Sequence, residues 1–123
     1  MNQADSGAGR LTTHVLDTAR GAPAANLGIS LFRLVEGRHE LVTEAVTNSD
    51  GRVDKPLLAG EDFVAGFYEL VFDAGDYLRR QNEDLPEPLF LDEIVVRFGV
   101  SGMGHYHVPL LLSPYGYSTY RGS

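Results

Sequence analysis

Short stretches in which apolar and polar residues alternate recur along the chain at intervals of roughly ten residues. They cover residues 11–21, 27–37, 39–52, 52–58, 66–75, 88–100, 105–113 and 117–123. Residues typical of turns separate them, as at Gly21–Pro23 and at the segment NSDG (48–51). Successive side chains of a strand point to opposite faces, so each stretch predicts a half-buried strand. About eight short strands at this spacing predict an all-β fold, an antiparallel sandwich or barrel.

Two stretches indicate finer detail. In 66–75 the residues Tyr68, Leu70 and Phe72 alternate with more polar neighbours and should face the core. Pro56 within 52–58 makes that stretch a strand at a sheet edge. Residues 76–82, DYLRRQN, are the one predicted helix, capped by Asp76 or preceded by Gly75.

Length and composition are those of a single globular domain. The chain has 123 residues, of which 43% are hydrophobic and 22% charged. The first ten are polar and Gly-rich, and we expect a flexible lead-in at 1–10 followed by a folded domain at 11–123. There is no cysteine and no apolar run of membrane-spanning length. The lead-in lacks the apolar segment of a secretion signal, so we expect a cytoplasmic protein.

Charge limits the choice of partners. The formal net charge is −7, which argues against nucleic acid, since phosphate binding needs a basic surface. Lys55 is the only lysine among ten basic residues, and the others are arginines. A place where arginine and histidine converge would therefore stand out in this acidic chain and would suit a small anionic ligand.

Three histidines are candidates for chemistry. His105 and His107 stand two residues apart in a predicted strand and so point to the same face. Such a pair can bind a metal ion, but alone it equally fits two surface histidines. His14 lies within the first predicted strand, and Asp17, three residues later, falls on the opposite face. Asp17 is therefore a poor orienting partner for His14.

The remaining candidates have simple alternative interpretations. His39 fits a solvated hairpin tip, Arg52 a solvated loop, and Arg121 a strand near the chain end that is held in a sheet or an interface. The sequence contains no Gly-x-Ser-x-Gly motif and no glycine-rich phosphate loop. From residues alone, we predict an acidic all-β domain whose three histidines and two arginines have an open role.

Four segments extend this interpretation. They are LTTHVLDTARGAPA (11–24), TNSDGRVDKPLL (47–58), GFYELVFDAGDYL (66–78) and HYHVPLLLSPYGYSTYRGS (105–123). In this order they resemble the transthyretin-related proteins, the 5-hydroxyisourate hydrolases of urate breakdown. The resemblance covers Leu11 to Ser123, and the ending Tyr-Arg-Gly-Ser is its most specific part.

The same fold includes transthyretin, a carrier of thyroid hormone, so the resemblance poses a choice between enzyme and carrier. Transthyretin has a lysine at the position of His14, a glutamate at that of Arg52 and a threonine at that of His107. This sequence has the hydrolase residue at all three positions. The resemblance therefore favours an enzyme, with a transthyretin-like carrier of a small aromatic ligand as the alternative.

The resemblance also implies an architecture. Each subunit would be a transthyretin-like (prealbumin-like) sandwich of two four-stranded sheets with one short helix. Edge strands at 89–100 and 105–113 would pair across a two-fold axis to form a dimer. Two dimers would stack into a homotetramer whose active sites lie in the channel between them.

The implied reaction is hydrolysis of 5-hydroxyisourate to 2-oxo-4-hydroxy-4-carboxy-5-ureidoimidazoline, without a cofactor. His14 and His107 would handle water and protons, and Arg52 would polarise the substrate's carbonyls. The residues expected to shape the pocket are His105, Tyr120, Arg121, Gly122 and Ser123. A zinc site formed by the three histidines is the rival, but two nearby arginines would repel a dication.

Overall fold

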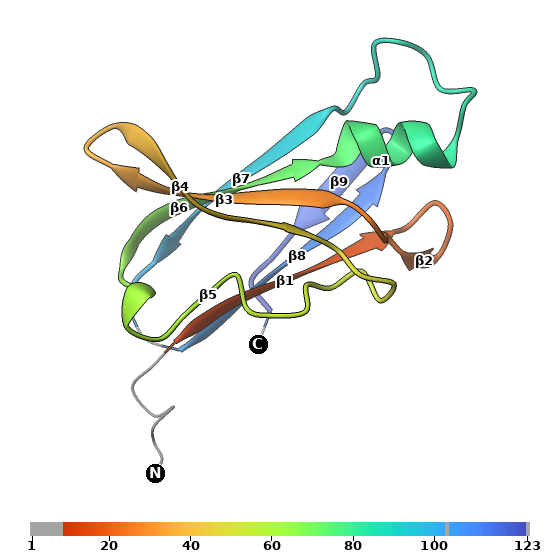
Figure 1. Cartoon of the computed structure of the whole chain (residues 1–123). Coiled ribbons are helices and arrows are strands. Elements are labelled where there is room, and N and C mark those ends of the chain that lie inside the picture. Colours follow the sequence, from red (N-terminus) through yellow and green to blue (C-terminus); the bar gives the residue numbers. More distant parts are fainter. Residues whose placement is uncertain (1–8, 103, 123) are drawn as a thin grey trace.

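Two β-sheets packed face to face form the molecule, with one helix at one end (Figure 1). The computed structural model describes residues 9–102 and 104–122. The first sheet has the order β4-β3-β6-β7, and the second has the order β2-β1-β8-β9, with β5 also paired to β1. The strands are β1 (Arg10–Asp17), β2 (Ala22–Pro23), β3 (Gly28–Val35), β4 (Arg38–Val46), β5 (Leu58–Ala59), β6 (Gly66–Asp73), β7 (Glu93–Val100), β8 (His105–Ser113) and β9 (Gly116–Thr119). The predicted all-β sandwich is confirmed, although the second sheet has five strands, two of them only two residues long.

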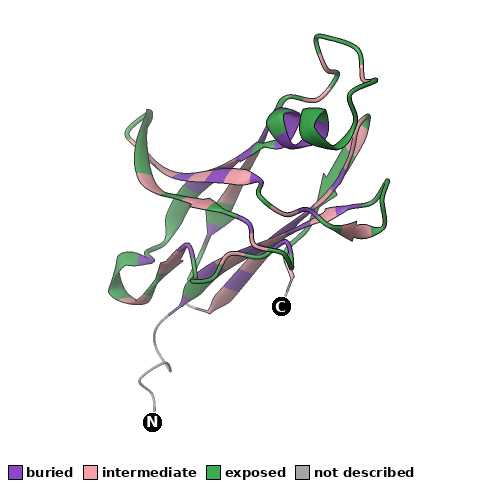
Figure 2. Ribbon diagram, turned by 45° about the vertical axis from the view of Figure 1, so that its right-hand side comes forward, coloured by how far each residue is buried: buried purple, intermediate pink, exposed green. Residues whose placement is uncertain are grey.

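The core lies between the sheets and follows the alternation of the sequence. Tyr68, Leu70 and Phe72 of β6 are fully buried, as predicted, together with Leu11 and Val15 of β1. Buried and more exposed residues alternate along β1 and over the first half of β8 (Figure 2). These two strands of the second sheet therefore have one face in the core and one that is free to carry a site.

Pairing in the second sheet differs from the prediction in one respect. β1 and β8 run parallel, with Thr12 opposite His107 and Arg10 opposite His105. β8 is also an interior strand, because β9 pairs with its other side. The expectation that 105–113 forms a sheet edge is therefore wrong, and β9 is the edge instead. The expectation for 89–100 is confirmed for β7, which ends the first sheet.

The helix α1 (Ala74–Gln81) begins two residues before the predicted Asp76. Asp73 occupies the N-cap position without a side-chain capping bond, and Asp76 lies in the first turn, so Asp76 is not the cap. Tyr77 anchors the helix to the end of β1, since its hydroxyl donates to Asp17 Oδ2 at 2.7 Å. Both side chains are buried, which gives Asp17 a structural role.

His39 lies within β4 and not at a hairpin tip, which corrects the prediction. Its Nε2 is 3.0 Å from Glu69 Oε1, and Arg97 Nε is 2.7 Å from the other oxygen of that carboxylate. Glu69 is 7% exposed although it points away from the core. This ion-paired cluster crosses β4, β6 and β7 and explains how the first sheet accommodates a buried charge.

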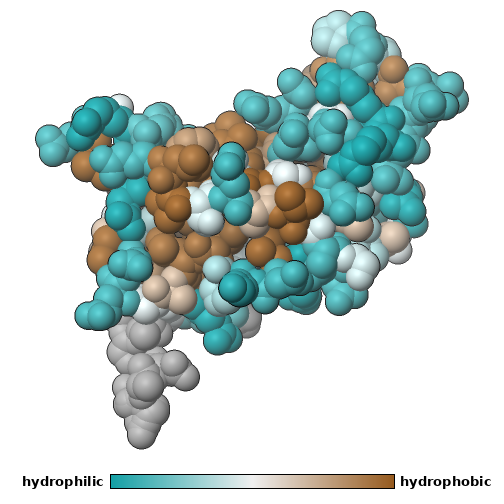
Figure 3. All heavy atoms as spheres, viewed as in Figure 1, coloured by the Kyte–Doolittle hydropathy of each residue, from teal (hydrophilic) through white to brown (hydrophobic). Residues whose placement is uncertain are grey.

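The open edge of the sandwich, where β4 faces β5, is apolar. Figure 3 shows hydrophobic residues gathered at the centre of this view. Leu41 and Val64, which are about half exposed, line one concavity together with Leu58 of β5. The expected lead-in at 1–10 overlaps the folded part of the chain, because Gly9 is buried and Arg10 is the first residue of β1. Residues 1–8 lie outside the described residues. No helix among the described residues is long and apolar enough to cross a membrane.

Candidate functional site

The free face of β1 and β8 carries the candidate histidines. Thr12 and His14 of β1 share this face with His105 and His107 of β8, and all four side chains are partly exposed. Their neighbours in sequence point into the core instead. The strand alternation predicted from the sequence thus brings the three histidines of this region to one surface.

A tight turn places Arg52 beside them. The side-chain Oδ1 of Asn48 accepts hydrogen bonds from the backbone N–H groups of Asp50 (2.9 Å) and Arg52 (3.1 Å). Gly51 has a φ of +75°, and its carbonyl accepts a hydrogen bond from Val15 N at 2.8 Å. His14 and Arg52 therefore pair as an isolated bridge. The predicted strand at 52–58 is absent from this segment of the structure except for Leu58, which starts β5.

The imidazole rings are close neighbours. The ring centroids of His14 and His107 are 6.4 Å apart, and those of His105 and His107 are 6.1 Å apart. The hydroxyl of Thr12 lies between the last two, 2.7 Å from His105 Nε2 and 2.8 Å from His107 Nδ1. The structure thus brings together His14, Arg52, His105 and His107, the four residues that the resemblance singled out.

Burial and nearby positive charge lower the pKa of these three histidines. Partial burial lowers the pKa of His14 and of His107, and the Arg52 guanidinium lowers both further. Burial also lowers the pKa of His105, with a second contribution from Arg10. Neutral imidazoles have a free lone pair at physiological pH, which is the state needed for a general base.

A cavity of about 480 Å³ opens over this face. Its lining includes Arg10, Thr12, Arg52, Lys55, His105 and His107. Three cations and one carboxylate, that of Asp54, thus line one concavity in a chain of net charge −7, and this local excess of positive charge suits a small planar anion. Sequence reasoning missed Arg10, which it placed in the lead-in, and Thr12. The signal was available, because both precede His14 at even spacing on the same strand face.

Only part of the described C-terminal segment contacts the histidines. Gly122 N donates to the His107 carbonyl at 2.7 Å, and a Cβ at Gly122 would lie 2.9 Å from His107 Cδ2. Arg121 lies with its guanidinium carbon 3.8 Å from the centroid of the Tyr106 ring. Arg121 is not among the residues that line the cavity in the described subunit. Tyr120 is 58% exposed, and Ser123 lies outside the described residues.

A three-histidine metal site was the rival interpretation. Within residues 9–102 and 104–122, no three His, Cys, Asp or Glu side chains are close enough to hold one metal ion. The arrangement fits acid–base chemistry better, since neutral histidines flank an arginine.

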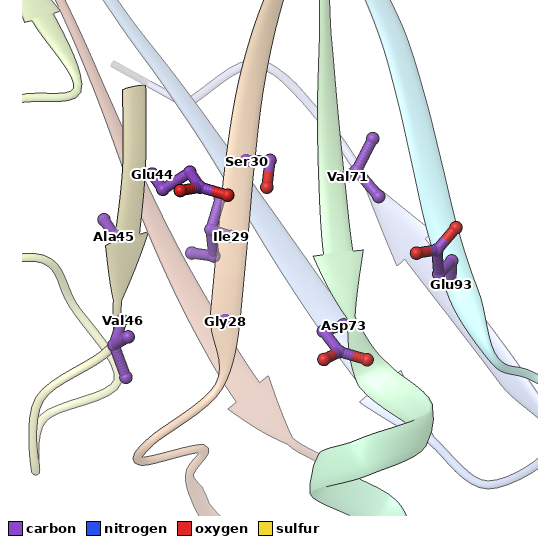
Figure 4. A pocket seen from close by; sticks show the side chains of 9 residues that line it. All are labelled: Gly28, Ile29, Ser30, Glu44, Ala45, Val46, Val71, Asp73 and Glu93. Atoms are coloured by element: carbon purple, nitrogen blue, oxygen red, sulfur yellow. The ribbon is translucent and has the colours of Figure 1, made fainter. Parts of the chain in front are cut away.

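A second concavity, of about 420 Å³, lies on the outer face of the first sheet (Figure 4). Its side chains include the carboxylates of Glu44, Asp73 and Glu93, and it is lined by no cation. An anion would be repelled there. The cavity over β1 and β8 is therefore the candidate site.

The chain is similar to known proteins over almost its whole length. Residues 11–122 match the profile of the HIUase/Transthyretin family. A protein of Mesorhizobium japonicum named 5-hydroxyisourate hydrolase is 64% identical over 115 residues, which are 94% of this chain and 93% of that protein.

Solved structures are similar over the same length. The 5-hydroxyisourate hydrolase of Klebsiella pneumoniae superposes with a TM-score of 0.78 at 33% identity, over 94% of this chain and 99% of that one. Sea bream transthyretin in complex with thyroxine gives a TM-score of 0.83 at 28% identity, over 92% and 94%. A structure titled (S)-allantoin synthase gives 0.89 at 46% identity; the match covers 95% of this chain but 44% of that longer one.

Proposed function

This chain belongs to the HIUase/transthyretin family, and from that premise we propose that it is a hydrolase that opens the ring of 5-hydroxyisourate. Water attacks a ring carbonyl carbon, the C–N bond of that amide breaks, and the nitrogen leaves with a proton. The product is 2-oxo-4-hydroxy-4-carboxy-5-ureidoimidazoline, a carboxylate. The reaction belongs to purine and urate breakdown.

The observation that carries the proposal is the grouping of Arg52 and His107, which line one cationic cavity, with His14, whose ring centroid is 6.4 Å from that of His107 and which pairs with Arg52. Ring opening needs a base for water, a proton donor for the leaving nitrogen and a stabiliser for the oxyanion that forms in between. A neutral histidine takes a proton from the attacking water, and the imidazolium so formed gives that proton to the leaving nitrogen, directly or through the second histidine. The Arg52 guanidinium supplies the third, because its planar fork binds carbonyl and oxyanion oxygens.

The substrate-binding roles rest on position. His105 lines the cavity beside His107, and Gly122 packs against the His107 ring. Tyr120 and Arg121 follow β9 directly. We assign to these residues, with Ser123, the shaping of the pocket wall. The pocket is open to solvent in a single subunit, and we propose that a second copy of the chain closes it.

The proposed assembly is a homotetramer in the cytoplasm. Large exposed side chains gather near β7 and β9, the two strand edges on one side of the sandwich: Phe67, Phe90, Val95, Tyr115, Tyr117 and Tyr120. Such a surface favours association of copies along these edges. Light scattering should then give a mass of four times 13.4 kDa. A fully active monomer would contradict the shared channel.

Turnover separates this proposal from its alternative, a carrier that binds a small aromatic ligand unchanged. Freshly made 5-hydroxyisourate loses its near-ultraviolet absorbance on hydrolysis, and we expect the protein to accelerate this loss in proportion to its concentration. Binding without acceleration would support the carrier. The same assay after dialysis against a strong chelator should give an unchanged rate; loss of activity that zinc restores would establish the three-histidine site.

A further inference from the structure

One hydroxyl group joins two of the site histidines. Thr12 Oγ1 lies 2.7 Å from His105 Nε2 and 2.8 Å from His107 Nδ1, and both distances are those of good hydrogen bonds. The parallel ladder explains this position. Thr12 stands opposite His107 in the register, and His105 precedes His107 by two residues on the same face of β8.

The chemistry of a hydroxyl restricts how both bonds can form. It has one hydrogen to donate, and its oxygen accepts. If neither facing nitrogen carried a proton, only one of the two bonds could exist. If both carried one, both would donate to Oγ1 and the hydroxyl hydrogen would need another acceptor. The two rings are the only hydrogen-bond partners of this hydroxyl among the residues that the structure describes. The satisfied arrangement has one protonated nitrogen and one bare nitrogen.

We propose that Thr12 is a positioning residue that locks His105 and His107 into the same tautomer, both protonated on Nε2 or both on Nδ1, and thereby sets which nitrogen of His107 is available for proton transfer. When His105 donates from Nε2, Thr12 donates to His107 Nδ1, and His107 carries its proton on Nε2. In the opposite arrangement His107 donates from Nδ1, and its Nε2 has the free lone pair of a base. The tautomeric lock stands on geometry alone; its effect on catalysis rests on the proposed function.

The surrounding charges are compatible with two neutral rings. His107 is faced by Arg52, His14 and His105, and His105 by Arg10. The cations disfavour a second proton on either ring. Thr12 therefore acts on the choice between the two tautomers of a neutral ring and not on whether the ring is protonated.

Neighbouring residues provide matched variants. Thr12→Val keeps the shape of the side chain and removes the hydroxyl, whereas Thr12→Ser keeps the hydroxyl. Thr13→Val is the control, since the Thr13 hydroxyl faces the core and donates to the Val108 carbonyl at 2.7 Å. Thr13→Val should lower stability without affecting the rings, and circular dichroism of each variant verifies that it is folded.

The direct test is nitrogen NMR of the histidine rings without substrate, because the shifts of Nδ1 and Nε2 distinguish the tautomers. We expect one dominant tautomer at each ring in the wild type, with opposite protonation of the two nitrogens that face Thr12. Thr12→Val should show averaging of both rings, and Thr12→Ser and Thr13→Val should resemble the wild type. Averaged rings in the wild type, or unchanged rings in Thr12→Val, would overturn the proposal.

Kinetics test the consequence. Thr12→Val should lower kcat by about 10- to 100-fold, as do other losses of a group that orients a functional histidine, with KM nearly unchanged. Thr12→Ser should restore most of kcat. A Thr12→Val enzyme with normal kcat would refute the positioning role. If the wild type itself does not turn over 5-hydroxyisourate, the proposed function fails, and the NMR result still decides whether Thr12 orders the rings.

Discussion

At the scale of single residues, the site depends on how Arg10 and Arg52 act on the histidines. Arg52 acts on His14 and His107, and Arg10 acts on His105. In each case burial is the larger cause of the lowered pKa and the cation adds to it. Below pH 6.5 these histidines bind protons more readily in the unfolded chain than in the folded protein. Their protonation therefore lowers the free energy of unfolding as the pH falls through that value.

NMR titration of the three histidines tests which arginine lowers the pKa of which histidine. In the wild type all three pKa values should lie below the ordinary 6.5. Arg52→Gln removes a positive charge, so the pKa of His14 and that of His107 should rise while His105 is unaffected. Arg10→Gln should raise only the pKa of His105. The two variants control each other, and a shift of the same histidines by both would contradict the assignment.

At the scale of elements, two connections position the site around the parallel pair β1 and β8. The first is the turn before Arg52. Gly51 has a φ of +75°, and a Cβ there would collide with the Val15 carbonyl and lie 3.1 Å from the Pro23 Cβ. The turn can therefore approach β1 closely enough to bridge His14 and Arg52 only with glycine at this position.

Gly51→Ala should accordingly lower both stability and activity. Gly37 is the matched control, because its φ is +78° but a Cβ there would meet nothing within 4 Å. Gly37→Ala should cost about 1–2 kcal/mol of unfolding free energy from the left-handed backbone alone. Gly51→Ala should cost more than that and reduce kcat/KM. Denaturant unfolding of both proteins measures the difference; equal losses with full activity would show that the close approach is unimportant.

The second connection is the segment after β9. Gly122 pairs with His107 as an isolated bridge, so this segment supports the strand that carries His107. Deletion of Tyr120 to Ser123 should leave the β-sheet spectrum intact but lower kcat/KM by at least about 10²-fold, or roughly 2.7 kcal/mol of transition-state stabilisation. Near-normal turnover by a truncated protein with a normal circular dichroism spectrum would remove this segment from the site.

At the scale of the whole molecule, alternation predicted most of the fold. It identified the buried face of β6 and the shared face of His105 and His107, because both follow from a period of two. It did not predict that β1 and β8 run parallel, since pairing partners depend on connections distant in sequence. The error in treating 105–113 as an edge has another origin: that expectation came from the resemblance, whereas β9 follows β8 after a short turn and pairs with it as a hairpin, Ser113 opposite Gly116.

Only part of the site could be predicted from the sequence, because some of its contacts arise from the pairing of strands that are distant in sequence. His14, Arg52 and His107 came from the resemblance, while composition and spacing left their roles open. Thr12 and Arg10 were overlooked because their meaning arises from the register across the ladder, where Thr12 meets His107 and Arg10 meets His105. The net charge of −7 suggested that a cationic convergence would matter, and the cavity with Arg10, Arg52 and Lys55 matches that expectation.

The most direct test of the central claim compares kcat/KM for 5-hydroxyisourate in His107→Gln and His39→Gln. His107 lies in the cationic cavity, whereas His39 lies on the other sheet, paired with Glu69. Removing an acid–base group should cost His107→Gln about 10²- to 10⁴-fold in kcat/KM, and His39→Gln should remain close to the wild type. A His107→Gln protein with wild-type kcat/KM, or equal losses in the two variants, would contradict hydrolysis at this site.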